Sequence, residues 1–409
     1  MSAAPEPVAQ PLCLPGRPTW LFRLRDYHLL FPNLMVRMAN TMSTSALPLL
    51  LVSLSFSPGH VGWIVSFGGL TSMLMNLVGG VVSDRFTKKR LMLLGVVGVS
   101  ITTTLLGLAR SSTQFICLRL GQGLATGMFR PASQALAYEL NPRRPAYIIG
   151  LLGSSYVLGN AAGPALGGYL ADGYGLRTCI VVGGLLAAGG ALYLLAVSRT
   201  LPALPRLRLP VRHQFRGLWV RGRRQVAVPL VVVLADAWIL NAWHVYLPIY
   251  LRQGLGLSYT EIGLYVGLES AFYVLCQPLA GRLMDRVGLR LPLALSLASH
   301  GLFIASIPLM TSKIGVLACL LLVGITNSAA HPGSVLLTAK LAGEHGRGTS
   351  LGLLSSASNL GQFIGPIFGG VVIAATGQQS AALYACLLPA LGGALAPLLL
   401  TKPDAVDQT

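Results

Sequence analysis

The sequence predicts an all-α membrane protein whose twelve transmembrane helices form two pseudo-symmetric six-helix bundles. The chain of 409 residues is 53% hydrophobic and only 10% charged, whereas a soluble domain carries roughly 25% charged residues. Apolar runs of about 20 residues, the length that crosses a hydrocarbon core, recur along the whole chain. In addition, two different sequence patterns each occur twice at nearly the same offset, which indicates that the second half of the chain repeats the first.

The first repeated pattern is Gly-x-x-x-Asp-Arg, a short group of charges between two apolar runs. It begins at Gly80 and again at Gly281, and its Asp-Arg pairs start 285 − 84 = 201 positions apart. The second pattern is a series of spaced glycines that contains a Gly-Pro pair. These pairs occupy 163–164 and 365–366, which are 365 − 163 = 202 positions apart. The repeated unit is therefore about half of the chain.

Twelve apolar runs can be counted. Six lie at 29–52, 61–82, 91–109, 114–139, 147–171 and 178–197, and six at 227–251, 260–283, 290–310, 314–340, 349–375 and 380–400. Each is expected to be helical, because inside lipid only a helix satisfies its own backbone hydrogen bonds. The predicted domains are a cytoplasmic tail (1–28), a six-helix bundle (29–197), a basic cytoplasmic linker (198–226), a second six-helix bundle (227–400) and a cytoplasmic tail (401–409).

The formal net charge of +18 does not indicate nucleic-acid binding, because of where the charges lie. Lys and Arg gather in alternate breaks between the apolar runs, which is the positive-inside bias of a multi-pass membrane protein. The richer breaks are on the side of the N-terminal tail, so both termini are expected on the cytoplasmic side of the inner (plasma) membrane. The linker is rich in Pro and Arg and is expected to touch anionic lipid head groups. We expect a monomer.

The sequence offers little support for a metal site, a cofactor or an enzyme. None of the six Cys residues has metal-ligand spacing, and five of them fall in or beside apolar runs, which is typical of packing residues. The stretch 331–333 (His-Pro-Gly) and scattered Ser residues provide no nucleophile–base pair at a recognisable spacing. An intramembrane enzyme is therefore not expected.

Three signatures, in order along the chain, resemble those of the major facilitator superfamily. The residues that resemble the loop between spans 2 and 3 are Gly80, Asp84, Arg85, Lys88 and Lys89. The stretch 119–123 (Arg-Leu-Gly-Gln-Gly) is similar to the signature of proton-coupled members. The residues that resemble the span 5 signature of twelve-span drug:proton antiporters are Gly150, Gly159, Gly163, Pro164, Gly167 and Gly168. The resemblance covers residues 28–400.

Two departures from the family pattern stand out. Thr87 replaces the usual Gly of the first signature, although Gly288 is present in the second copy. The first span also has no acidic residue and carries Arg37 instead, where many exporters of cationic drugs rely on carboxylates. This departure argues against export of cationic drugs.

The resemblance implies a secondary active transporter that works by rocking-bundle alternating access. Our first expectation is proton-coupled export of a small amphipathic molecule. The chain contains no nucleotide-binding P-loop, so the proton gradient would supply the energy and no cofactor is needed. The alternative is proton-coupled uptake or flipping of an anionic solute or lipid. The expected partners are the small-molecule substrate, protons and membrane lipids.

Two sets of residues are candidates for controlling the conformation. The resemblance implies that Asp84 contacts the start of span 11, and Arg85 could pair with Glu139. The predicted conformational lock consists of Gly80, Asp84, Arg85, Glu139, Asp285 and Arg286. The simpler interpretation is that these charges only set the topology of the chain in the membrane.

The resemblance also implies that the Gly-Pro run of span 5 contacts span 8, and that the Gly-Pro run of span 11 contacts span 2. The predicted helix-packing hinge consists of Gly159, Gly163, Pro164, Gly365 and Pro366, which could equally be static packing.

Ionisable residues within the spans are the strongest functional signals, because each is costly in a membrane unless it is paired or hydrated. Asp236 follows five apolar residues (230–234) and is the first candidate for a proton carrier. The proton-coupling candidates are Asp236, Glu269, Arg119 and His331. A structural ion pair is the alternative for the two acids, a hydrogen bond to carbonyl groups for Arg119, and packing for His331.

Spans 1, 4, 7 and 10 line the cavity in the family, and their polar residues are the candidates for binding the substrate. These candidates are Arg37, Asn40, Arg130, Asn327 and His244. Arg37 and Arg130 could jointly attract an anionic group, although Arg37 could also extend to the interface. His244, with Trp238, Trp243 and Tyr246, is expected at the outer mouth or in the aromatic belt.

Overall fold

The structure, a computed structural model, describes residues 27–85, 87–140, 145–198 and 223–398. Side chains at 76–85, 138–140, 145–146, 149, 223–226 and 339–352 fall outside this description. The N-terminal half contains α2 (Leu30–Ser53), α3 (Pro58–Arg85), α4 (Lys88–Leu108), α5 (Ser112–Leu140), α6 (Pro145–Tyr174) and α7 (Leu176–Val197). The C-terminal half contains α8 (Arg223–Gly254), α9 (Tyr259–Val287), α10 (Arg290–Ser306), the 3-10 helix η3 (Ile307–Leu309), α11 (Lys313–Asn327), α12 (Ala330–Thr376), α13 (Ala381–Tyr384) and α14 (Leu387–Leu398).

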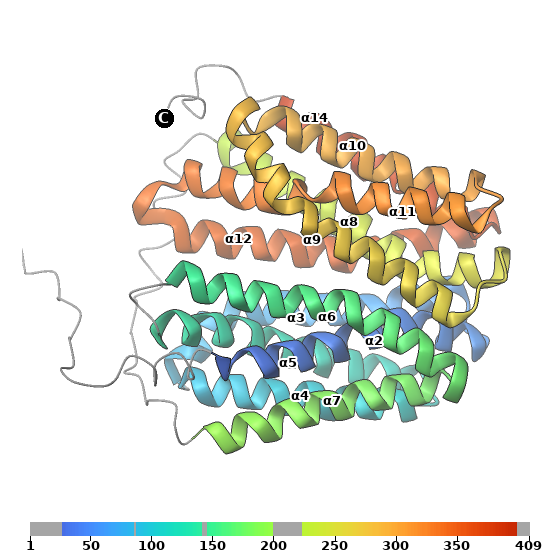
Figure 1. The fold of residues 1–409 in the computed structure, drawn as a ribbon, viewed down its shortest axis with the longest axis horizontal. Helices are drawn as coiled ribbons and strands as arrows, with labels where there is room; N and C mark the ends of the chain where they lie inside the picture. The colour runs from blue at the N-terminus through green and yellow to red at the C-terminus, as the bar shows by residue number, and fades with distance from the viewer. Residues whose placement is uncertain (1–26, 86, 141–144, 199–222, 399–409) are drawn as a thin grey trace, which may run out of the picture.

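The long helices run roughly side by side, with the two halves stacked against each other (Figure 1). Eight helical segments within the described residues are long and apolar enough to cross a membrane by length and composition: Lys88–Leu108, Leu176–Val197, Ala227–Gly254, Tyr259–Val287, Arg290–Leu309, Lys313–Thr338, Leu353–Thr376 and Ala381–Leu398. The helices α2, α3, α5 and α6 are 24, 28, 29 and 30 residues long and lie among them.

Three details differ from the predicted boundaries. The run 314–340 is interrupted, because α11 ends at Asn327 and α12 begins at Ala330. The break expected between 340 and 349 has helical backbone within α12. The final run is divided into α13 and α14 by a short turn. Hydropathy marks apolar length, but it does not distinguish a straight helix from one that turns and continues.

The two copies of the charged repeat end in different ways, which explains the departure at Thr87. In the first copy Thr87 has an extended backbone (φ −69°) and caps α4, where its hydroxyl accepts a hydrogen bond from the Arg90 amide. In the second copy Gly288 follows α9 with φ +84°. Only this second position lies in the backbone region that favours glycine. A threonine in the first copy supplies a helix cap instead.

The buried apolar side chains form three clusters. One lies wholly within the N-terminal half and one wholly within the C-terminal half. The third joins the halves, because Leu47, Ile64 and Phe115 share it with Tyr246 and Ile249 of α8. The halves are therefore joined by a common apolar core at one end of the molecule. We call this end the closed end.

Two helix pairs form the seams at the closed end, α6 with α9 and α3 with α12. The seams are tight: a side chain on Gly263 would collide with the carbonyl oxygen of Pro164, and one on Gly62 with the carbonyl oxygen of Pro366. These two glycines are 263 − 62 = 201 positions apart, so the seams repeat each other. The Tyr246 hydroxyl also donates to the Pro366 carbonyl oxygen at 2.5 Å.

Asp172, near the end of α6, adds a polar contact between the halves. Its carboxylate accepts hydrogen bonds from the Tyr259 amide (3.0 Å), the Thr260 amide (2.7 Å) and the Thr260 hydroxyl (2.6 Å). It therefore caps the N-terminus of α9, where a helix presents unpaired N–H groups and a positive dipole end.

At the opposite end α6 and α9 diverge (Figure 1). Gly150 and Gly153 of α6 and Gly281 of α9 have no atom of another segment within 4 Å of where a Cβ would lie. The two halves therefore pack closely at the closed end and separate along this pair of helices toward the other end.

Candidate functional site

The ionisable side chains predicted for the cavity fall into two sets, one in each half. In the N-terminal half, two guanidinium groups share one aromatic ring. The Arg37 guanidinium carbon is 4.1 Å from the centre of the Tyr156 ring, and that of Arg130 is 5.3 Å from it. Arg37 also donates a hydrogen bond to Asn160, one helical turn beyond Tyr156.

In the C-terminal half, Asp236 of α8 faces His300 of α10. The Asp236 carboxylate oxygen is 3.5 Å from His300 Nδ1. Asp236 is 5% exposed and His300 is fully buried. Neither of these two atoms has a hydrogen-bond partner among the described residues. The pair is thus an ion pair when the imidazole is protonated, and a contact between unsatisfied polar groups when it is not.

Glu269 of α9 is the second buried acid in this half, at 3% exposed. Its carboxylate accepts a hydrogen bond from Ser270 at 3.1 Å. Asp236 and Glu269 interact electrostatically with each other and with Tyr273, which lies one turn after Glu269. Asn327 is also buried, and its side-chain oxygen has no partner in the described part of the chain.

Electrostatic interactions connect the two sets of residues across the boundary. His331 interacts with Asp236 of its own half and with Arg130 of the other. His244 interacts with Arg37 and with His300. The candidates Arg37, Arg130, Asp236, Glu269, His244 and His331 therefore belong to one central cluster, which also includes Tyr156, Tyr273 and His300.

Arg119 belongs to a separate network inside the N-terminal half. Its guanidinium donates to Gln122 at 2.6 Å and to the Val65 carbonyl oxygen of α3 at 2.7 Å. Gln122 in turn donates to Thr103 at 2.9 Å and to Asn40 at 3.4 Å. The network ties α5 to α2, α3 and α4, and Asn40 is the member that comes from the first span.

The predicted conformational lock falls mainly on side chains that the structure does not describe. Gly80, Asp84 and Arg85 lie in the last turns of α3, and Glu139 lies next to the end of α5; their side chains are outside the described residues. Asp285 and Arg286, in the second copy, are exposed near the end of α9. The lock therefore stays a prediction.

The predicted hinge residues lie at helix contacts. A side chain on Gly159 would meet the Arg37 side chain of α2, and one on Gly163 would meet Thr41. A side chain on Gly365 would meet the Trp238 carbonyl oxygen of α8 at 2.5 Å. Pro164 and Pro366 contact the opposite half in the seams of the closed end. The contacts are close, and a role for them in gating stays a prediction.

One of the two positions expected for these aromatic residues, the aromatic belt, is wrong. Trp243 and Tyr246 are 0% and 1% exposed and pack in the core of the bundle. His244 is partly buried next to Trp243, with ring centres 4.1 Å apart. Aromatic residues near the end of an apolar run satisfy the belt pattern equally well whether they face lipid or another helix.

The sequence analysis missed Tyr156, Asn160 and Tyr273. A signal was present for the first two, because residues four apart share one face of a helix. Both lie in the glycine-rich run of α6, which was interpreted from its glycines alone. Tyr273 carries no charge and gave no comparable signal.

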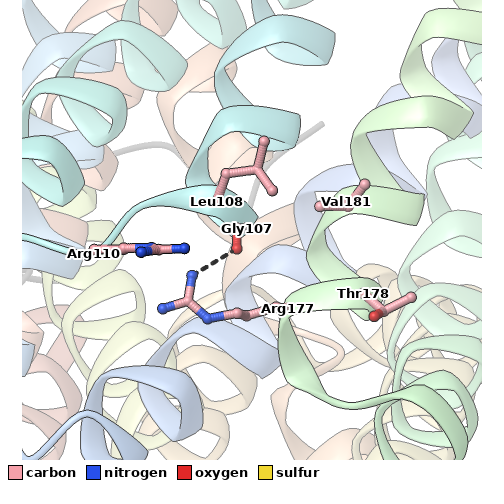
Figure 2. A pocket seen from close by; sticks show the side chains of 6 residues that line it. All are labelled: Gly107, Leu108, Arg110, Arg177, Thr178 and Val181. Carbon is pink, nitrogen blue, oxygen red and sulfur yellow. Dashed lines mark hydrogen bonds between the residues drawn. The ribbon is translucent and has the colours of Figure 1, made fainter.

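A cavity of about 450 Å³ lies elsewhere, beside the end of α4 and the start of α7. Figure 2 shows Arg177 and Arg110 at this cavity, with Arg177 donating to the Gly107 carbonyl oxygen. Arg177 also donates to Ala109 at 2.7 Å, so it caps the C-terminal carbonyl groups of α4. None of the predicted site residues lines this cavity. The described residues also contain no group of three or more His, Cys, Asp or Glu side chains that could hold a metal ion.

Comparison with known proteins agrees with this architecture. The family model of the Major Facilitator Superfamily matches residues 29–258 and 231–409. The chain belongs to this superfamily. It is therefore a multi-pass membrane transporter rather than an enzyme, as the sequence predicted, with a small molecule as its substrate.

The relatives of this transporter differ in the function that their names give. It is 27% identical to the multidrug resistance protein MdtG of Serratia proteamaculans over 78% of each chain. It is 24% identical to the Staphyloferrin B transporter of Staphylococcus aureus, over 85% of this chain and 82% of that protein. A bacterial homologue of the human lysosomal transporter Spinster, solved in an inward-facing and unoccupied conformation, superimposes with a TM-score of 0.76 at 16% identity, covering 93% of this chain and 96% of that one. The last similarity shows the fold alone.

Proposed function

We propose that this transporter couples proton movement to the export of a small amphipathic molecule by alternating access. The observation that carries the proposal is the placement of Asp236 and Glu269. Both are buried within the C-terminal half, and no Lys or Arg of the described residues lies within ion-pair distance of either. An ionised acid at membrane depth costs about 3 kcal/mol unless it is paired or hydrated. Each carboxyl group is therefore costly as a charged group when the space around it is dry, and less so when that space is hydrated.

The geometry of the seams supports the alternating step. In this conformation the shared core, the repeated Gly–Pro contacts and Asp172 hold one end closed. Exchange to the other conformation requires these contacts to separate and the diverging ends of α6 and α9 to approach. Protonation of Asp236 and Glu269 removes their need for water, so it favours the state in which the gap around them closes.

The similarity to MdtG supports export, and the predicted orientation, with both termini in the cytoplasm, would place the diverging ends on the cytoplasmic side. Proton-coupled uptake or flipping of an anionic solute or lipid is the second candidate. Arg37 and Arg130 favour it, because they place two cations at one point of the boundary. The proton gradient would drive either process without a cofactor.

The proposal can be tested in proteoliposomes with a pH-sensitive dye inside. Ethidium and 1-anilinonaphthalene-8-sulfonate, added separately, serve as a cationic and an anionic amphipathic probe. We expect at least one of them to drive proton movement in the wild type, and Asp236→Asn to abolish that movement while the protein still binds the probe.

Glu261→Gln is the matched control. Glu261 is also an acid of the C-terminal half, but it is partly exposed at the closed end, where it pairs with Lys313. Its variant should retain proton movement. Undiminished coupling in Asp236→Asn removes Asp236 from the mechanism, and the absence of proton movement with either probe in the wild type contradicts proton coupling.

A further inference from the structure

Arg37 and Arg130 come from different helices, α2 and α5, and meet at the ring of Tyr156 on α6. Two guanidinium groups repel each other, so holding both near one ring requires a compensating interaction. The ring faces supply part of it through cation–π attraction. Asn160 supplies one hydrogen bond, to Arg37 alone.

No carboxylate of the described residues pairs with either guanidinium group to offset their repulsion. The ion pairs of the described chain are Asp236 with His300 and Glu261 with Lys313, and neither involves Arg37 or Arg130. The buried acids of the described residues, Asp236 and Glu269, belong to the opposite half. The two arginines therefore form a positively charged site without an internal counterion in this part of the chain.

The site is accessible to a ligand. Arg130 is exposed, and Arg37 and Tyr156 are partly exposed. A guanidinium at this depth is stable next to water or protein and costly next to lipid, so the exposed surface of Arg130 indicates a hydrated gap between the halves. A guanidinium fork binds carboxylate, sulfonate or phosphate oxygens with two parallel hydrogen bonds.

We propose that Arg37 and Arg130, held against Tyr156, bind an anionic group of the transported molecule, so that the substrate is an amphipathic organic anion. The inference rests on the proposed function only in taking the bound molecule as the transported one. Tyr156 acts as a positioning residue, because its ring fixes both guanidinium groups. The apolar body of the substrate would then lie toward the opposite half. In that half, His244 interacts electrostatically with Arg37, and His331 interacts with Arg130.

Four naphthalene derivatives with the same ring system test the charge preference. They are 2-naphthoate and naphthalene-2-sulfonate as anions, 2-naphthamide as the neutral compound and 2-naphthylmethylammonium as the cation. The purified full chain in detergent is melted with each compound over a concentration series, and the rise in Tm gives an apparent affinity. We expect both anions to bind at least about tenfold more tightly than the amide and the cation.

Arg130→Gln is the main variant, because Arg130 is exposed and its removal leaves the Arg37–Asn160 hydrogen bond in place. It should weaken both anions about tenfold or more and leave the amide unchanged, and Arg130→Lys should restore part of the affinity. Tyr156→Leu should weaken the anions, whereas Tyr156→Phe, which keeps the ring, should not. The Tm without ligand reports whether each variant folds.

Arg110→Gln is the matched control, since Arg110 is an exposed arginine of the same half that lies at the cavity beside α4 and α7. Its anion affinity should equal that of the wild type. Three outcomes would each overturn the proposal. The first is equal binding of the anions and the cation, and the second is no stabilisation by either anion. The third is undiminished anion binding in Arg130→Gln.

The same variants separate this inference from proton coupling. Anion binding that depends on Arg130, together with no probe-driven proton movement in proteoliposomes, would support the anion site and contradict the proposed coupling. Proton movement that Arg130→Gln leaves unchanged, with anions and cations bound equally, would contradict the anion site alone.

Discussion

The two halves of the molecule share one scaffold, but they carry opposite chemistry at their boundary. At the repeat offset of 201, Gly62 corresponds to Gly263, and both fit against a Pro carbonyl of the other half. At the same offset Arg130 corresponds to His331, because 331 − 130 = 201. Within the described spans, the N-terminal half contributes Arg37, Arg119 and Arg130, and the C-terminal half contributes both acids and all three histidines of the cluster.

This difference teaches which features of a duplicated transporter are free to diverge. The glycines of the seams are fixed by contact, because any side chain there meets backbone atoms of the other half. Arg130, by contrast, is exposed, so a change of charge at this position alters binding rather than packing. Four experiments test this distinction, from the largest expected effect to the smallest.

Gly62→Val and Gly263→Val should have the same large effect if the seams are equivalent. The new side chain would collide with Pro366 in the first variant and with Pro164 in the second, so the closed end cannot form. We expect probe transport in proteoliposomes to fall at least about tenfold in both. Gly281→Val, on α9 at a position with open space, should retain transport; a similar loss there would show that the damage is not specific to the seam.

His331→Arg makes the C-terminal half resemble the N-terminal half at the corresponding position. It places a permanent cation at a position that interacts electrostatically with Asp236 and Arg130, and the cation stabilises the Asp236 carboxylate. We expect probe-driven proton movement to fall about tenfold, the factor for about 1.4 kcal/mol of added stabilisation. His60→Arg, at an exposed histidine, is the control. Normal coupling in His331→Arg would mean that the charge difference between the halves has no part in proton transfer.

Asp172→Asn weakens the polar contact that joins the halves at the closed end. Because two amides and a hydroxyl donate to this carboxylate, and hydrogen bonds to charged groups contribute about 1.5–3 kcal/mol each, the closed end should open about tenfold more often. Spin-label distances between α6 and α9 measure this population. Lys313→Gln breaks an exposed pair inside one half and should change the population less than about threefold; an equal effect of the two would contradict a role for Asp172 between the halves.

The smallest effect concerns the two ends of the charged repeat. Gly288→Ala introduces a Cβ at φ +84° and should lower the free energy of unfolding by about 1 kcal/mol. Thr87→Gly removes a cap from a position with φ −69°, and a glycine cap costs only a few tenths of a kcal/mol. Thermal unfolding in detergent compares them. A larger loss for Thr87→Gly would reverse our account of why the copies differ.

The sequence predicted the fold because the information is local or repeated. Apolar length predicts helices, and the offset of 201 predicts two related bundles, with no knowledge of contacts. The turn at 328–329 and the helical backbone at 341–348 were missed, because hydropathy does not record the direction of the chain. The prediction of an aromatic belt was wrong at Trp243 and Tyr246, because a side chain buried against helices and one buried in lipid give the same sequence signal.

For the candidate site, the sequence by itself determined which ionisable groups lie within the spans, because each is costly in lipid and stands out among apolar neighbours. It did not determine their partners. Asp236 meets His300 rather than an arginine, and Arg37 meets Tyr156 and Asn160. The tertiary structure alone decided that Arg37 and Arg130 meet at one ring and that Asp236 meets His300, because only helix packing brings residues of different helices into contact.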